Sequence, residues 1–385
     1  MTGQFSINAI PKILFGSGRL AEIGDKVTAL TGSTAPVLLI VDPALAKQGI
    51  TARALQHLQQ AGHESRIFDA FSGEPKSSTI DQASAAAVDA HARVIVGLGG
   101  GTALDTAKLV SACAASGAPA ETYELCKSPL PAEPLPFIAV PTTAGTGSEV
   151  TSTSVFTNSK GVKVWAWDPR LKPRLALLDP ELTLGVPPPI TAATGLDALV
   201  HAIEACTNRN RNDIADLYCH RAISLIAANL KRAVEDGSDL EARGAVLLGS
   251  CLAGIGIDNC GTALAHNISH ALAALAPIAH GRATGLAMLA TMDWVAEAAP
   301  EHFANVAVAM GEPPDASAAV AAFERLVRSL GIKISIDGEG LDLNRPEHLA
   351  EQMAAPENAP MRKSTRRTIV DDDLVPLARR LFALH

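Results

Sequence analysis

The stretch VIVGLGGGTALDTAK at residues 94–108 decides the fold of the first half of this chain. Its β-branched residues predict a buried strand, its glycines a tight turn, and a helix is expected to begin near Thr102. Glycines let the backbone approach a pyrophosphate, and the first turn of the helix offers N–H groups and the positive end of a dipole. Because Thr102 stands where G-x-G-x-x-G has its third glycine, an ordinary strand-to-helix turn also fits.

The same alternation continues on both sides of this stretch. Buried strands are predicted at 37–41 (VLLIV), 137–140 (FIAV) and 175–178 (LALL), and helices with 3.6-residue periodicity at 50–61 and 79–91. Strands that alternate with helices predict a parallel sheet covered by helices.

The pattern changes after a triple proline at 187–189. Long alanine- and leucine-rich stretches follow, and helices are expected at 191–206, 213–234, 239–255, 262–276 and 283–298. We therefore predict an α/β dinucleotide-binding domain with a Rossmann-like parallel sheet over residues 1–185, followed by an all-α domain over residues 186–385.

Four side chains of the kind that binds metals lie in two segments of the second half. TGLDALVHAIEA (194–205) carries Asp197 and His201, and HNISHALAALAPIAHG (266–281) carries His266 and His280. A carboxylate and an imidazole at i and i+4 face the same way on a helix, about 6 Å apart along its axis. With the other two imidazoles they would make an N3O site for a divalent metal such as Fe2+ or Zn2+. The pattern predicts a catalytic metal centre, although the first pair alone also fits a helix surface.

Two further segments are candidates for binding a dinucleotide. Asp42 closes the strand at 37–41, where a carboxylate can bind the adenosine ribose and repel a 2′-phosphate, which favours NAD over NADP. PTTAGTGSEVT (141–151) follows another strand, although such hydroxyl-rich clusters are often only loops or helix caps. Its candidate donors to phosphate or ribose are Thr142, Thr143, Thr146 and Ser148.

A weaker candidate lies near the start of the chain. FGSGRLA (15–21) matches G-x-G-x-x-A, but Gly16 and Gly18 fit a simple turn equally well.

The composition excludes several functions. The formal charge is −8 and the basic residues are dispersed, so no nucleic-acid partner is expected. The six cysteines contain no CxxC pair and no disulfide framework. We see no signal peptide and no charge-free apolar segment long enough to span a bilayer, and therefore expect a cytoplasmic protein without a membrane partner.

Taken together, these motifs resemble the iron-containing (group III) alcohol dehydrogenase family, whose architecture is dehydroquinate synthase-like. GGGTALDTAK is similar to the family's GGGSxxDxAK loop, PTTAGTGSEVT to its PTTxGTGSE stretch, and the two histidine-bearing segments to its metal segments. The resemblance covers nearly the whole chain. It implies a metal-dependent, NAD-linked homodimer that reversibly transfers a hydride between an alcohol and its aldehyde or ketone.

The resemblance also implies roles for individual residues. Asp197, His201, His266 and His280 would bind the metal, with Fe2+ favoured and Zn2+ possible, and His270 would be a catalytic proton relay. Together with Ser148, the residues at cofactor-binding positions are Asp42, Gly100, Gly101, Thr102, Asp105, Thr142, Thr143, Thr146, Lys163 and Leu182.

Departures from the family pattern leave the substrate open. Glu74 stands where members often carry Asn, Trp165 and Trp167 are bulky for their place, and Arg282 could form a salt bridge or select a carboxylate. Small alcohols and their aldehydes are the expected substrates. The alternatives are a maleylacetate-reductase-like or hydroxy-acid oxidoreductase, a glycerol-dehydrogenase-like polyol enzyme, and a catalytically silent NAD-binding scaffold. The complete set of motifs argues against the metal-free reductase, the polyol enzyme and the scaffold, whereas Arg282 and Trp165 leave hydroxy acids and bulkier alcohols open as substrates.

Overall fold

The computed structural model describes residues 4–71 and 73–384, which form two compact units. The α/β unit comprises residues 9–143 and 148–185. The helical unit comprises residues 4–8, 144–147 and 186–384. The segment 144–147 therefore belongs to the helical unit, although the chain on both sides of it belongs to the α/β unit.

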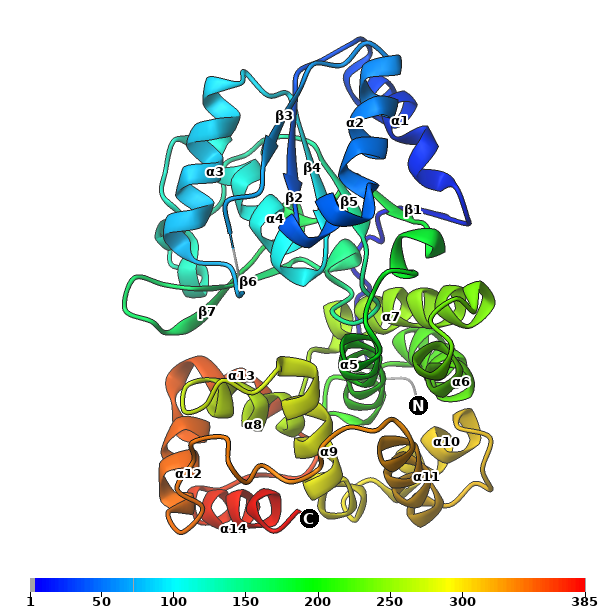
Figure 1. The fold of residues 1–385 in the computed structure, drawn as a ribbon. Helices are drawn as coiled ribbons and strands as arrows, with labels where there is room; N and C mark the ends of the chain where they lie inside the picture. The colour runs from blue at the N-terminus through cyan, green and yellow to red at the C-terminus, as the bar shows by residue number, and fades with distance from the viewer. Residues whose placement is uncertain (1–3, 72, 385) are drawn as a thin grey trace. The chain divides into compact units, whose positions relative to one another are not determined.

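A six-stranded parallel sheet forms the centre of the α/β unit (Figure 1), as the sequence predicts. Its strand order is β1-β8-β5-β4-β2-β3. The strands are β1 (Lys12–Phe15), β2 (Val37–Val41), β3 (Ser65–Phe68), β4 (Val94–Gly99), β5 (Phe137–Pro141) and β8 (Leu175–Leu178).

Helices cover both faces of this sheet. Because successive residues of a strand point to opposite faces, Leu38 and Ile40 pack on one side of β2, and Leu39 packs on the other. The first side is covered by α3 (Ser77–Asp89) and α4 (Gly101–Ser116), the second by α1 (Ile23–Thr31) and α2 (Ile50–Gln60). The central strands are buried on both faces, which explains their continuous apolar sequences.

The strand order reverses between β2 and β4. From β2 the chain continues to β3 on one side and then crosses to β4 on the other, and all of these strands are parallel. In open α/β sheets, ligands bind outside the carboxyl ends of the strands at such a switch point. Here these ends are followed by Asp42 and by the glycines at 99–101.

A two-stranded antiparallel hairpin was not predicted from the sequence. It consists of β6 (Thr153–Thr157) and β7 (Lys163–Trp167), in which Val155 is paired with Trp165. Phe156 and Val164 pack into the same core as α4. Short 3-10 helices complete the chain's regular structure: η1 (Arg19–Glu22), η2 (Pro43–Gln48), η3 (Ala120–Cys126), η4 (Ser148–Val150), η5 (Pro169–Leu171), η6 (Pro180–Thr183) and η7 (Pro356–Asn358).

The helical unit is built around α5 (Pro188–Thr207), which packs against α6, α7 and α9 (Figure 1). Pro188 and Pro189 occupy its first turn, where a missing N–H costs nothing, so the triple proline starts the helix as well as ending the α/β pattern. The other helices are α6 (Asp213–Glu235), α7 (Leu240–Cys260), α8 (Leu264–Ala273), α9 (His280–Ala296), α10 (Pro300–Ala309), α11 (Ala316–Ser329), α12 (Pro346–Ala354), α13 (Ala359–Ser364) and α14 (Asp371–Phe382).

One helix in the described chain, α7, is long and apolar enough to cross a membrane by length and composition alone. Two-thirds of its most apolar window is buried against other helices of its unit. A core helix of a soluble protein passes the same test, so α7 is weak evidence for a membrane span.

A buried polar cluster, consisting of Asp105, Lys108, Glu149 and Thr151, holds the chain after β5 against α4. Lys108 is fully buried, and its Nζ donates to Thr151 Oγ1 at 2.9 Å and lies 3.6 Å from Asp105 Oδ1. Glu149 is 2% exposed, and its Oε1 has no hydrogen-bond partner in the described part of the chain. Burial raises the pKa of the Glu149 carboxyl from 4.5 to about 7, although Lys108 acts in the opposite direction.

The raised pKa of Glu149 predicts that stability falls as the pH rises. Between pH 4.5 and 7 the folded state holds a proton on Glu149 that the unfolded state has released, and the full cost applies above pH 7. That cost is about 3 kcal/mol at most. We therefore expect Glu149→Gln to raise the midpoint of thermal unfolding by several degrees at pH 8.5 and to change it little at pH 5.

The exposed Glu133 provides the matched control, since Glu133→Gln removes a charge without removing a buried one. Thermal unfolding followed by circular dichroism from pH 5 to 8.5 measures all three proteins. If wild type and Glu149→Gln kept the same difference in midpoint at every pH, Glu149 would not be the group responsible.

Candidate metal centre and nucleotide-binding loops

Helix α5 carries the first pair of candidate ligands. Asp197 and His201 lie one turn apart in the middle of this helix and are 3% and 5% exposed. The distance from Asp197 Oδ2 to His201 Nδ1 is 3.9 Å. The helical spacing predicted from the sequence is therefore present, and it lies in the interior of the unit instead of on a helix surface.

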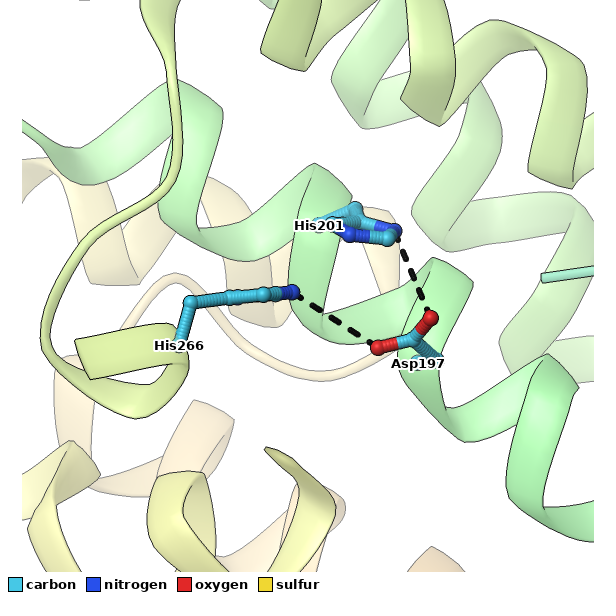
Figure 2. Close-up of side chains that lie close together, drawn as sticks. All are labelled: Asp197, His201 and His266. Carbon is cyan, nitrogen blue, oxygen red and sulfur yellow. Dashed lines mark ion pairs between the residues drawn. The ribbon is translucent and has the colours of Figure 1, made fainter. Parts of the chain in front are cut away.

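Helices α8 and α9 bring the other two imidazoles to Asp197. The Nε2 atoms of His266 and His280 each lie 3.6 Å from Asp197 Oδ1. The rings of His201 and His266 are stacked with centroids 4.5 Å apart, and Figure 2 shows both beside the Asp197 carboxylate. One candidate ligand atom from each of Asp197, His201 and His266 lies within 4.8 Å of the others. The structure thus gathers all four predicted ligands.

A glycine allows α9 to approach α5 this closely. A Cβ at Gly281 would lie 2.1 Å from the carbonyl oxygen of Ala193 and 3.2 Å from Asp197 Cβ. The first clash is with backbone and cannot be relieved by a side-chain rotation. Gly281 therefore fixes the position of its neighbour His280 relative to Asp197.

The polar atoms at the centre of this cluster fit a bound cation. Asp197 Oδ1 and His266 Nε2 are buried and have no hydrogen-bond partner among the described residues. Their separation of 3.6 Å is too long for a hydrogen bond but suits two ligands of one ion. A buried carboxylate oxygen without a partner is costly, and a divalent metal would remove that cost. One carboxylate and three imidazoles are the donor set expected for Fe2+ or Zn2+.

The charges in the cluster shift the proton equilibria of its members. Burial raises the pKa of the Asp197 carboxyl, but the surrounding histidines, His201 first, outweigh it and hold this pKa well below its usual range. Burial lowers the pKa of His201. Burial also opposes protonation of His266, whereas Glu204 and Asp197 raise its pKa to about 9. Metal binding at neutral pH would therefore displace a proton from His266.

Each candidate histidine ligand has a hydrogen-bond partner at its Nδ1 atom. For His201 the partner is the carbonyl oxygen of Gly145 at 3.3 Å, and for His280 it is Ser269 Oγ at 3.1 Å. For His266 it is Glu204 Oε2 at 2.6 Å. None of these three partners was predicted from the sequence. The available signal was the spacing of Glu204 on α5, three residues after His201 and seven after Asp197, which places it near the same face.

His270, the predicted proton relay, lies one turn after His266 on α8. Its ring centroid is 6.4 Å from that of His266 and 5.6 Å from that of His280. Unlike His266 it is partly exposed to solvent. This position beside the candidate ligands, with access to water, suits a group that transfers protons.

The glycine loop of the α/β unit leads directly into α4. Gly99 has φ +156°, and a Cβ there would lie 2.7 Å from Ala103 Cβ and 3.0 Å from Asp42 Cβ. No side chain caps the N-terminus of α4 at Gly100, so the amides of its first turn remain available for an anion. Asp42 lies next to this loop, and its Oδ1 accepts a hydrogen bond from the Ala44 amide at 2.9 Å.

Several predicted cofactor residues surround the same turn. Thr142 N donates to Gly99 O at 3.0 Å, Thr143 is the side chain closest to Gly100, and Thr102 Oγ1 donates to Gly73 O at 3.0 Å. Gly101 is the first residue of α4. Thr146 belongs to the helical unit.

Asp105 and Ser148 are bonded to each other. Asp105 Oδ1 accepts from Ser148 Oγ at 2.5 Å, and its Oδ2 accepts from Val155 N at 3.0 Å. The Asp105 carboxylate is therefore engaged in holding the segment 148–155 against α4. This geometry favours a positioning role over direct contact with a cofactor.

The G-x-G-x-x-A match at 15–21 has a structural explanation. Asp179, which is fully buried, accepts hydrogen bonds from the amides of Gly18 at 3.1 Å and Leu20 at 3.0 Å. The amides that would bind a phosphate are thus occupied by a carboxylate, and this segment is a turn. Leu182, a predicted cofactor residue, is buried in the core of the sheet, which leaves only its backbone available to a ligand.

The departures from the family pattern also have structural roles. Lys163 Nζ forms an ion pair with Glu74 Oε1 at 2.6 Å. Arg282 forms an ion pair with Glu339 at 2.7 Å and donates to the carbonyl oxygens of Lys333 and Ser335. The guanidinium therefore holds the segment 333–339 against the start of α9 through one ion pair and two hydrogen bonds. Of the two roles considered for Arg282, the structure favours the salt bridge.

Comparisons with known proteins place the chain among its relatives. The family model described as "Iron-containing alcohol dehydrogenase" matches residues 11–180, and the one described as "Fe-containing alcohol dehydrogenase family, C-terminal" matches residues 191–381. A 1,3-propanediol dehydrogenase from Citrobacter freundii is 34% identical over 349 residues, which cover 89% of this chain and 87% of that protein. An NAD-dependent methanol dehydrogenase from Bacillus methanolicus is 32% identical over 321 residues, covering 83% and 84% respectively.

A solved structure gives the same result. The crystal structure of a sulfoacetaldehyde reductase from Bifidobacterium kashiwanohense in complex with NAD+ matches with a TM-score of 0.89 and 30% sequence identity, covering 99% of this chain and 100% of that one. Sequence motifs, fold and comparisons agree: this chain belongs to the iron-containing alcohol dehydrogenase family.

Proposed function

We propose that this protein is a metal-dependent, NAD-linked alcohol dehydrogenase that interconverts small primary alcohols and their aldehydes. The observation that carries this proposal is the pair of buried, unpartnered atoms Asp197 Oδ1 and His266 Nε2 beside two further imidazoles. In a purely structural helix bundle, buried polar atoms are normally hydrogen-bonded, whereas in a metal site such atoms are satisfied by the metal.

In this proposal Asp197, His201, His266 and His280 hold a divalent metal, with Fe2+ favoured by the family. When bound, the metal supplies Lewis-acid chemistry that polarises the oxygen of an alcohol or carbonyl. The burial of Asp197 and His201 excludes water from their side of the site. The ligands themselves are held by helix backbone and by hydrogen bonds at each Nδ1, so they need little rearrangement.

The α/β unit supplies the dinucleotide site. The amides at the start of α4 would bind the pyrophosphate, and Asp42 would bind the adenosine ribose. When bound there, NAD would supply the hydride-accepting chemistry of the reaction. Asp105 and Ser148 keep the hydroxyl-rich loop in place through their mutual hydrogen bond.

His270 would move the proton that balances this reaction. Oxidation of an alcohol releases a hydride and a proton, and a ring nitrogen of His270 would receive the proton and pass it to water. In the reverse direction the same nitrogen would return a proton to the carbonyl oxygen.

Small alcohols are the substrates best supported. The relatives include enzymes named for 1,3-propanediol and for methanol. A hydroxy acid is the second candidate, since a reductase named for sulfoacetaldehyde, an aldehyde that carries an anionic group, is also similar. Arg282 does not support it, because this guanidinium is already bonded to Glu339 and to two carbonyl oxygens.

The proposal predicts NAD reduction that depends on metal. Protein stripped of metal and reloaded anaerobically with Fe2+ or Zn2+ is assayed with a panel of alcohols, diols and hydroxy acids. We expect turnover only after reloading, and highest kcat/KM with a small primary alcohol. NAD binding without metal-dependent turnover on any substrate would contradict the proposal and favour the scaffold alternative.

One variant and one control test whether this activity depends on the cluster of candidate ligands. Asp197→Asn keeps the shape of the side chain but removes its charge, and we expect kcat/KM to fall by more than about 100-fold because several kcal/mol of charge stabilisation are lost. His302→Ala, on α10, removes a histidine that pairs with Glu301 outside the cluster, and should leave activity unchanged.

The position of Asp42 predicts the preference for NAD. Asp42→Asn keeps an acceptor for the Ala44 amide but removes the charge that would repel a 2′-phosphate. We expect the ratio of kcat/KM for NADP over NAD to rise about 10-fold or more, since one such charge interaction exceeds 1.4 kcal/mol. Asp89→Asn, at the C-terminal end of α3 and before the start of β4, is the control. An unchanged ratio in the Asp42 variant would remove Asp42 from the cofactor site.

We also propose a soluble, cytoplasmic homodimer. Its support is the family resemblance together with the edge strand β1, on which Phe15 is 39% exposed. After cell fractionation the protein should appear in the soluble fraction and sediment at twice the chain mass of 39.9 kDa. Sedimentation at the mass of a single chain at micromolar concentration would contradict the dimer.

A further inference from the structure

We propose that Glu204 is a positioning residue of the metal centre, which fixes the tautomer and orientation of His266 and ties this ligand to the start of α8. This inference rests on the proposed function, because it assigns to Glu204 a role in holding a ligand of the proposed metal. Glu204 is not a ligand itself.

The Glu204 carboxylate makes three short contacts beside the candidate ligands. Its side chain is 4% exposed, and its Oε2 lies 2.6 Å from His266 Nδ1. The same carboxylate accepts hydrogen bonds from the amide of Ala263 at 2.8 Å and from the amide of Ala265 at 2.6 Å. These amides belong to the N-terminus of α8, where the residue preceding the helix, Ala263, provides no side-chain cap. One carboxylate from α5 therefore caps α8 and contacts the histidine that α8 carries.

This arrangement determines which nitrogen of His266 faces the cluster. Both oxygens of the carboxylate accept hydrogen bonds from backbone amides, and in this acceptor role Oε2 is matched by an N–H at Nδ1 of His266. The Nε2 atom, 3.6 Å from Asp197 Oδ1, is then the atom left to bind a metal. A carboxylate behind a ligand also increases the basicity of the ring.

The hydrogen-bond partners described at Nδ1 of the other two histidines are uncharged. The Nδ1 of His201 faces a backbone carbonyl at 3.3 Å, and that of His280 faces the hydroxyl of Ser269 at 3.1 Å. Both partners are neutral and more distant. Of these three hydrogen bonds, the one between His266 and Glu204 is the shortest and has a carboxylate as its partner.

Asn208 provides a control for the purely structural part of this role. It is the C-cap residue of α5, four residues after Glu204, and its Nδ2 donates to the carbonyl oxygens of Cys260 and Gly261, both at 3.0 Å. Asn208 and Glu204 thus both attach α5 to the segment that precedes α8. In the described part of the chain, however, Asn208 forms no hydrogen bond with any of the four candidate ligands. A substitution of Asn208 weakens this attachment without removing the partner of His266.

The experiment compares Glu204→Gln with Asn208→Ala. Dissociation constants for Zn2+ and Co2+ are measured by competition with a chelator, the visible spectrum of the Co2+ form reports ligand geometry, and thermal unfolding of the metal-free proteins reports stability. We expect Glu204→Gln to raise the metal dissociation constant 10- to 100-fold and to alter the Co2+ spectrum, as loss of such partners does elsewhere. Asn208→Ala should lower the unfolding midpoint while its dissociation constant stays within about 3-fold of wild type.

A double-mutant cycle tests whether Glu204 acts through His266. In a His266→Ala background, Glu204→Gln should have little further effect on metal affinity, because the group it positions is gone. If Glu204→Gln does not fold, Glu204→Asp, which keeps the charge on a shorter side chain, takes its place in the same measurements.

The outcomes separate this inference from the proposed function. Wild-type affinity and spectrum in the Glu204 variant would overturn the positioning role, as would losses that match those of Asn208→Ala. Full additivity with His266→Ala would also overturn it. Wild-type protein that binds neither metal would overturn the proposed function itself, and the inference with it.

Discussion

The burial of the Asp197 carboxylate is the constraint on which the rest of the helical unit depends. A carboxylate removed from water in a helix core is strongly destabilising unless opposite charges or hydrogen bonds compensate it. Asp197 Oδ1 has no hydrogen-bond partner among the described residues, and its neighbours at 3.6 Å are the Nε2 atoms of His266 and His280. Imidazoles compensate an anion fully only when they are protonated, whereas a divalent metal does so while they are neutral. The cluster is therefore a site whose polar atoms are best satisfied by a cation.

The packing of three helices follows from this constraint. Helix α5 carries Asp197, His201 and Glu204, so one buried helix supplies the carboxylate, an imidazole and the partner of another imidazole. Helix α8 is attached to α5 by Glu204 through two backbone amides and a side chain, and α9 approaches because Gly281 has no Cβ. The candidate ligands thus lie on helices, and side chains on such rigid elements are held more precisely than side chains on loops.

Much of the fold and the set of candidate ligands could be predicted from the sequence, because both depend on patterns among residues that are close in sequence. The spacing of Asp197 and His201 predicted a helix pair, and VIVGLGGGTALDTAK predicted a strand, a turn and a helix, all of which are present. Contacts between distant segments were missed. Glu204 meets His266 across 62 residues, and Asp179 meets Gly18 across 161. The hairpin β6–β7 was missed because its strands alternate buried and partly exposed residues and contain hydroxyls and a lysine, unlike the continuous apolar strands of the sheet.

The same distinction explains why the class of reaction is clearer than the substrate. The reaction depends on side chains whose spacing is local, such as the ligand pair on α5 and the glycines before α4. Substrate selection depends on walls formed by distant segments, and Arg282 illustrates the difficulty. From sequence, a guanidinium next to a candidate ligand suits a carboxylate substrate as well as a salt bridge. In the structure this guanidinium forms an ion pair with Glu339, 57 residues away in the sequence. Its other N–H groups donate hydrogen bonds to two backbone carbonyl oxygens of the same loop. A charge beside a metal site therefore indicates specificity only after its partners within the chain are known.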